Sequence, residues 1–143
     1  MTDLERAVAL LHEGDHSVVL VRGDDVLVSD DRGVAPLVRW VDSGDDLSGF
    51  SAADRVVGRA AALLYVLLGV EAVCGDVMAR GAVDVLSAHG ITASHGTLAE
   101  QIVNRAGTGP CPMEAATAGI DEPSEALRAI KAKQAELRAH ARA

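Results

Sequence analysis

The densest group of chemically competent side chains lies in a short segment, Gly107 to Glu114. Cys111 stands between Pro110 and Pro112, and Glu114 follows three residues later. A thiol and a carboxylate at this spacing fit a ligand pocket, with Cys111 as a nucleophile or a redox thiol. The alternative is a rigid, proline-braced loop in which the cysteine is simply packed. The pattern therefore predicts Cys111 and Glu114 as ligand-binding residues and assigns no catalytic residue.

Two polar residues, Asn104 and Arg105, precede this loop. A guanidinium group pairs with carboxylate or phosphate, and a side-chain amide suits a base or a ribose hydroxyl. Arg105 could equally offset the dipole at the C-terminal end of a helix. We count both residues as candidates for ligand binding.

A second group of candidates follows the capping-box pattern of Ser51 to Asp54, which predicts the start of a helix that runs to about Leu68. Asp54, Gly58 and Arg59 then lie in its first turns, and we count them as ligand-binding candidates. In the alternative interpretation Ser51 and Asp54 only cap the helix. Gly58 favours close packing or ligand approach, because glycine inside a helix costs about 1 kcal/mol relative to alanine.

A metal site would have to draw on side chains that are scattered along the chain. Cys74 falls in a predicted buried strand, where a thiol is usually inert. Cys74, His95, Cys111 and Glu114 are the candidate ligands, yet only the last two are close in sequence. We therefore predict no metal site and no cofactor.

Periodicity of the apolar residues predicts the elements that position these side chains. Residues 71–94 read as strand, helix and strand, which predicts a βαβ unit with parallel strands and a right-handed crossover. The whole pattern predicts an α/β fold, a three-layer α/β/α sandwich with a mixed sheet. The predicted helices are 3–12, 34–41, 51–68, 77–89, 97–105 and 123–141, and the predicted strands are 17–22, 26–29, 71–75 and 91–94.

The 143 residues suit one domain. We expect residues 1–122 to form it, and residues 123–143 to form a helix that packs on the domain or on a partner. The apolar stripe of this last helix also raises the alternative of a homodimer.

Charge and composition exclude several classes of partner. The net charge of −8 repels phosphate backbones, and aromatic residues, which stack bases, make up only 2% of the chain. We therefore predict no nucleic-acid partner. The longest apolar run, Ala60 to Leu68, has nine residues and is too short to span a bilayer. With no signal-peptide pattern and only two cysteines, we expect a cytoplasmic protein without a membrane partner.

Four segments resemble a bacterial and archaeal family called domain of unknown function 1893, over about residues 3–120. The most specific is Asn-Arg-x-Gly-x-Gly-x-Cys-Pro-Met-Glu; the four segments are Gly58–Leu64, Cys74–Met78, His89–Ile91 and Asn104–Glu114. The resemblance implies a cytidine-deaminase-like fold and no established reaction.

This resemblance also allows a test of zinc-dependent deamination. Zinc deaminases hold the metal with residues at two helix N-termini and move the proton with a glutamate. The corresponding starts here are near Gly58-Arg59-Ala60 and Asp76 to Arg80, which carry no His or Cys ligand. Without zinc there is no activated water, so deamination by the usual mechanism is not expected.

Three functions remain in competition. The first is a non-catalytic, zinc-less deaminase-like domain that binds a nucleotide-like or ribose-containing small molecule. The second is an enzyme with other chemistry that uses Asp54, Cys111 or Glu114. The third is a homodimeric interaction protein. We favour the first, because the metal ligands are missing while the glycine-rich loop is kept.

Overall fold

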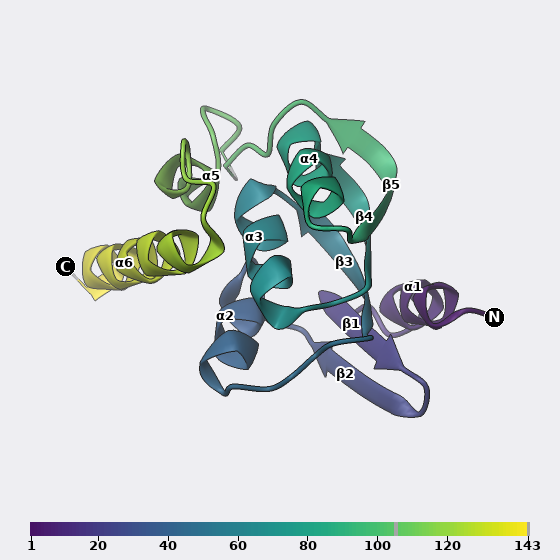
Figure 1. Cartoon of the computed structure of the whole chain (residues 1–143). Helices are drawn as coiled ribbons and strands as arrows, with labels where there is room; N and C mark the ends of the chain where they lie inside the picture. The colour runs from purple at the N-terminus through teal and green to yellow at the C-terminus, as the bar shows by residue number, and fades with distance from the viewer. Residues whose placement is uncertain (105, 143) are drawn as a thin grey trace.

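A five-stranded open mixed sheet forms the centre of the molecule (Figure 1), a computed structural model that describes residues 1–104 and 106–142. The strand order is β2-β1-β3-β4-β5. β1 runs antiparallel to β2 and β3, whereas β3, β4 and β5 are parallel. This confirms a mixed α/β architecture. The strands are β1 (Val18–Arg22), β2 (Asp25–Ser29), β3 (Ser51–Val57), β4 (Ala72–Ala79) and β5 (Thr92–Ala99).

Helices cover both faces of this sheet (Figure 1). Side chains of β1 alternate, since Val19 and Val21 pack with α1, whereas Val18 and Leu20 join the larger core on the other face. That larger core also contains residues of α2, α3 and α4. The helices are α1 (Asp3–Glu13), α2 (Ala35–Asp42), α3 (Arg59–Leu68), α4 (Arg80–Ala88), α5 (Pro112–Ala116) and α6 (Pro123–Arg142).

The first predicted elements are confirmed. Thr2 and Glu5 form the expected capping box of α1, with the Glu5 N–H donating to Thr2 Oγ1 at 3.1 Å. The β1–β2 hairpin and the helix that begins beside Pro36 are also present. These elements depend on local signals, such as a capping box, a turn glycine or a proline at a helix start, which can be read from a few adjacent residues.

The predicted helix over 51–68 is wrong in its first part. Ser51–Val57 form strand β3, which pairs with β1 and β4, and the helix α3 begins only at Arg59. Ser51 and Asp54 therefore cap no helix. Because β3 is central and covered on both faces, it shows no polar-apolar alternation, and the chance capping-box pattern dominated. Gly58 is the N-cap of α3 rather than an interior glycine.

The predicted helix over 97–105 is also wrong, since Thr97 continues strand β5 to Ala99. β4 likewise extends to Ala79, so α4 begins at Arg80 instead of residue 77. The predicted βαβ unit is present as β4-α4-β5 with parallel strands. A second βαβ unit, β3-α3-β4, is also present. It was not predicted, because residues 51–57 were assigned to a helix.

The last helix, α6, lies against its own chain. It contacts α3 and α5, and Ala126 and Ile130 are fully buried there. Leu137, further along the helix, is 41% exposed. The homodimer stays a prediction.

Candidate functional site

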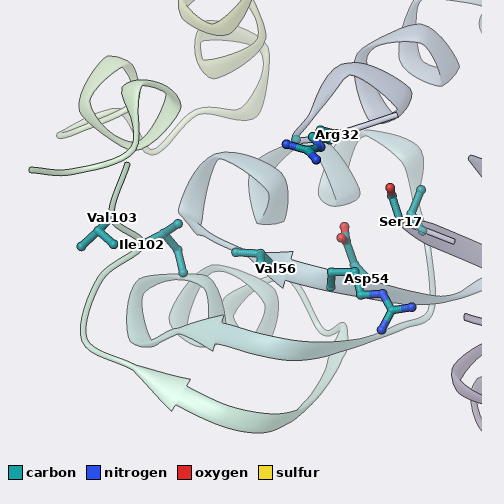
Figure 2. Close-up of a pocket in the computed structure, with 9 residues that line it drawn as sticks. Ser17, Arg32, Asp54, Val56, Ile102 and Val103 are labelled. Carbon is teal, nitrogen blue, oxygen red and sulfur yellow. The ribbon is translucent and has the colours of Figure 1, made fainter. Parts of the chain in front are cut away.

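A cavity of about 470 Å³ opens beside the second half of β3 (Figure 2). Its walls come from the start of β1, from the loop between β2 and α2, and from the segment after β5. The lining residues are Ser17, Val18, Arg32, Gly33, Asp54, Arg55, Val56, Ile102 and Val103.

Of the described residues that line this cavity, Asp54 is the charged one that is nearly buried, with 8% of its surface exposed. Its Oδ2 accepts a hydrogen bond from the Tyr65 hydroxyl at 2.7 Å. Burial nevertheless raises the pKa of Asp54 to about 7. Near neutral pH the carboxyl group therefore exists in both protonation states, so it can accept or donate a hydrogen bond.

Tyr65 supports Asp54 from helix α3. Its side chain is fully buried, and burial and then the neighbouring Asp54 carboxylate raise its pKa well above the ordinary value. The phenol stays protonated and serves as a fixed donor. The sequence analysis overlooked this pair. The signal was the single tyrosine, in a helix that is otherwise apolar, because a buried tyrosine hydroxyl needs a partner.

Arg32 brings a positive charge to the rim of the cavity. It lies in the loop before α2, next to Gly33, whose φ of 66° lets the chain turn there. Within the described part of the chain, no ion pair or hydrogen bond engages its guanidinium group. Figure 2 shows the Asp54 carboxylate pointing into the space below Arg32, with Ser17 on the same side. Arg32 and Ser17 were not among the predicted site residues.

A small apolar recess of about 100 Å³ continues the cavity toward helix α3. The two spaces share Gly33, Val56 and Ile102 as walls. The recess is further lined by Val34, Gly58, Ala60, Ala61, Cys111, Met113 and Glu114. Three predicted site residues, Gly58, Cys111 and Glu114, are thus brought together near Asp54.

Glu114 has a structural role at this recess. Its Oε1 accepts the Arg59 N–H at 2.6 Å and its Oε2 accepts the Ala60 N–H at 2.8 Å. Gly58, the N-cap, has no side chain to satisfy these donors, so a carboxylate from α5 caps α3. A Cβ at Gly58 would stand 2.3 Å from Glu114 Oε1. A larger residue at position 58 would therefore clash with the Glu114 carboxylate, which explains the glycine.

The Arg59 side chain points to the C-terminal segment. It donates to the Thr117 carbonyl at 2.7 Å and to Asp121 Oδ1 at 2.6 Å. A separate cavity of about 300 Å³ also includes Arg59 in its lining. Arg59 therefore does not line the space above Asp54.

Asn104 holds a loop together. Its Oδ1 accepts the Thr108 N–H at 3.0 Å, and its Nδ2 donates to Thr108 Oγ1 at 3.2 Å. The Cys111 N–H donates to the Ile102 carbonyl at 2.9 Å, which closes this loop. Arg105, the neighbouring candidate, lies outside the described residues.

The four side chains that were considered as metal ligands do not form a cluster. In the part of the chain that the structure describes, no group of three or more His, Cys, Asp or Glu side chains could hold a metal ion. Cys74 is in register with Ala53, which packs toward α1, whereas Cys111 lines the recess beside α3. The two thiols are on opposite faces of the sheet.

No helix among the described residues is long and apolar enough to cross a membrane.

The fold and the sequence together place the chain in a family. The family model for a domain of unknown function, DUF1893, matches residues 6–134, so the chain belongs to this family. The crystal structure of a DUF1893 family protein from Thermotoga maritima superposes with a TM-score of 0.85 at 25% sequence identity. The match covers 93% of this chain and 91% of that one. None of the curated proteins compared with the chain matches it.

Proposed function

We propose that this chain is a small-molecule-binding domain whose ligand lies in the cavity above Asp54. The observation that carries the proposal is that one cavity contains a nearly buried carboxyl group and, at its rim, an arginine without an ion pair among the described residues. Asp54 is at the floor, and Arg32 has no counter-charge in the described part of the chain. The volume of about 470 Å³ falls within the usual range for ligand pockets.

The chemistry of the walls favours a nucleotide-like or ribose-containing compound. Arg32 suits a phosphate or carboxylate group, as guanidinium groups pair with both. Asp54 and Ser17 are placed to bond hydroxyl or amino groups. Val56 and Ile102 supply apolar contact for a ring. Arg55, the other arginine of the described lining, is already paired with Asp76. An acidic protein in which Arg32 is the available cation of the cavity would select a small anion rather than a polyanionic nucleic acid.

We further propose that the fold is cytidine-deaminase-like and zinc-less. The arrangement of two consecutive parallel βαβ units behind an antiparallel hairpin supports this proposal. Helices α3 and α4 begin at Arg59 and Arg80, with no His or Cys in their first turns. At α3, the backbone N–H groups are occupied by Glu114 instead.

A thermal-shift panel tests the binding function. Nucleosides, nucleotides, ADP-ribose and NAD are added to the wild-type chain and to the Arg32→Gln and Asp54→Asn variants. A ligand at about 100 times its Kd should stabilise the wild-type chain by about 2.7 kcal/mol, which raises Tm by several degrees. Both variants should lose most of this shift.

Arg39→Gln is the matched control, because Arg39 is exposed, pairs with Asp31 at 2.7 Å and does not line the cavity. It should keep the full shift. The proposal fails if no compound shifts Tm, or if Arg32→Gln and Asp54→Asn respond like the wild type.

A second candidate function, catalysis by Asp54 as a general acid or base, is favoured by its pKa of about 7. Cys111 and Glu114 have weaker claims, since Glu114 is already engaged by α3. The test is mass spectrometry of the same panel after incubation with the chain. Product formation that is lost with Asp54→Asn even at compound concentrations that saturate its weakened site would support catalysis; unchanged compounds would contradict it.

A further inference from the structure

The apolar recess beside the cavity has no use in the binding chemistry described so far. Its walls include Val34, Ala61, Cys111 and Met113. Among the described residues that line it, Glu114 is the one with a charged side chain, and each of its carboxylate oxygens already accepts a backbone N–H from α3. The recess can therefore make apolar contacts with carbon atoms of a ligand, and it has no free charged group that would bind a charged one.

Val56 links the recess to the cavity. It belongs to both walls and to the central strand β3, yet 46% of its surface is exposed. The other apolar side chains of this strand are buried. An exposed valine in this strand is explained if the two spaces form one continuous site around it, because strands in the parallel part of a sheet are normally covered on both faces.

We infer that the recess is a subsite for a compact, uncharged, apolar group carried by the same ligand whose polar part lies above Asp54. This inference rests on the proposed function and narrows the class of ligand. An apolar cavity of about 150 Å³ holds benzene, so a recess of about 100 Å³ takes roughly four non-hydrogen atoms. The ligand is therefore amphiphilic: a methyl-bearing group or one ring edge enters the recess, and the charged end faces Arg32.

The two cysteines provide a reporter and its internal control. Cys111 lines the recess, while Cys74 lies on the other face of the sheet, and both thiols are free and half-buried. Alkylation of each by iodoacetamide is followed by peptide mass spectrometry on the full chain. An occupant of the recess slows the reaction of Cys111 and leaves that of Cys74 unchanged.

Isopropanol and urea are the probes, because each has four non-hydrogen atoms and only isopropanol carries apolar groups. Isopropanol should halve the Cys111 rate at a concentration on the order of 10–100 mM, as expected for so small a ligand. Urea at the same concentration should have no effect. The subsite is overturned if isopropanol leaves the ratio of the two cysteine rates unchanged, or if urea protects equally.

Filling the recess provides the structural control. Ala61→Leu places extra carbons in the recess from α3, and Val34→Leu does so from the start of α2. Either variant that folds should lose isopropanol protection. Ala132→Leu, on the exposed surface of α6, should keep it.

The same readout separates this inference from the proposed function. A panel compound that raises Tm through Arg32 but leaves Cys111 unprotected would overturn the inference and leave the binding function intact. If no panel compound binds, the proposed function fails, and the isopropanol result still decides whether the subsite exists.

Discussion

The Tyr65 hydroxyl donates a 2.7 Å hydrogen bond to Asp54 Oδ2 inside the protein, which joins helix α3 to strand β3 at the floor of the cavity. This contact fixes the carboxyl group that the binding proposal depends on. Burial outweighs the Tyr65 hydrogen bond and leaves the pKa of Asp54 near 7. The stability of the fold therefore depends on pH near neutrality.

The Asp54 carboxyl group should make the chain less stable as pH rises from about 4 to about 7. In this window the folded chain holds a proton that the unfolded chain, with a pKa near 3.8, has released. The free energy of unfolding should fall by up to roughly 1.4 kcal/mol per pH unit, and this group adds no further change above pH 7. Urea unfolding across this range measures the slope.

Asp54→Asn should remove that slope and leave the contributions of other carboxylates in place. The pKa values of Glu5, Asp46 and Glu122 are lowered by local hydrogen bonds in both proteins, so their contributions cancel in the comparison. Parallel curves for the two proteins would show that Asp54 is not the titrating group.

Replacing Glu114 by alanine should destabilise the fold. The Arg59 and Ala60 N–H groups lose their acceptor at the start of α3, which should cost about 1–2 kcal/mol in the free energy of unfolding. Glu136→Ala is the control, because the partner of Glu136 among the described residues is Lys133 and the substitution should cost less than about 0.5 kcal/mol. Equal losses in denaturant unfolding would contradict the capping role.

Gly58→Ala should be harmful only while Glu114 is present. The backbone at Gly58, with φ of −93° and ψ of −177°, suits any residue, so the cost must come from the new Cβ against the carboxylate. A double-mutant cycle with Glu114→Ala should show a coupling on the order of 1 kcal/mol. Additive effects would mean that glycine is needed there for another reason.

Arg55 should anchor helix α1 to the sheet. Its guanidinium group donates to the Leu11 and His16 carbonyls, both at 2.9 Å, and to Asp76 at 3.2 Å. Arg55→Gln should cost about 2 kcal/mol, since three hydrogen bonds from a charged donor to partly buried acceptors are lost together.

Hydrogen exchange locates this loss. The amides of α1 should exchange faster in Arg55→Gln, whereas Arg80→Gln, which removes an exposed arginine paired with Glu100, should leave them unchanged. Protection in α1 that survives Arg55→Gln would refute the anchoring role.

The sequence was sufficient where the signal was local. The capping box of α1 and the hairpin turn at Gly23 each act within a few residues, and both are confirmed. The predictions for β3 and for the end of β5 were wrong, because Ala52 and Thr97 are held in strands by pairing with neighbours that are distant in the chain. A local pattern such as Ser-x-x-Asp cannot report such pairing.

The site was predicted in part for a similar reason. The Cys111–Glu114 segment, Asp54 and Gly58 were singled out by residue type, and the fold brings them to adjoining spaces. Arg32 and Ser17 sit in short loops without a motif, so only the fold shows that they face Asp54. The acceptance of two α3 N–H groups by Glu114 spans more than 50 residues of sequence and leaves no local trace.

The most direct test of the central claim is a nitrogen-15 chemical-shift map of the chain with the compound that gives the largest thermal shift. The account predicts that the largest changes cluster at the amides of Gly33, Val56 and Ile102, which surround the cavity above Asp54. The same titration of Arg32→Gln should show these changes at much higher ligand concentration. Shifts that concentrate elsewhere, or that Arg32→Gln does not weaken, would contradict a ligand site above Asp54.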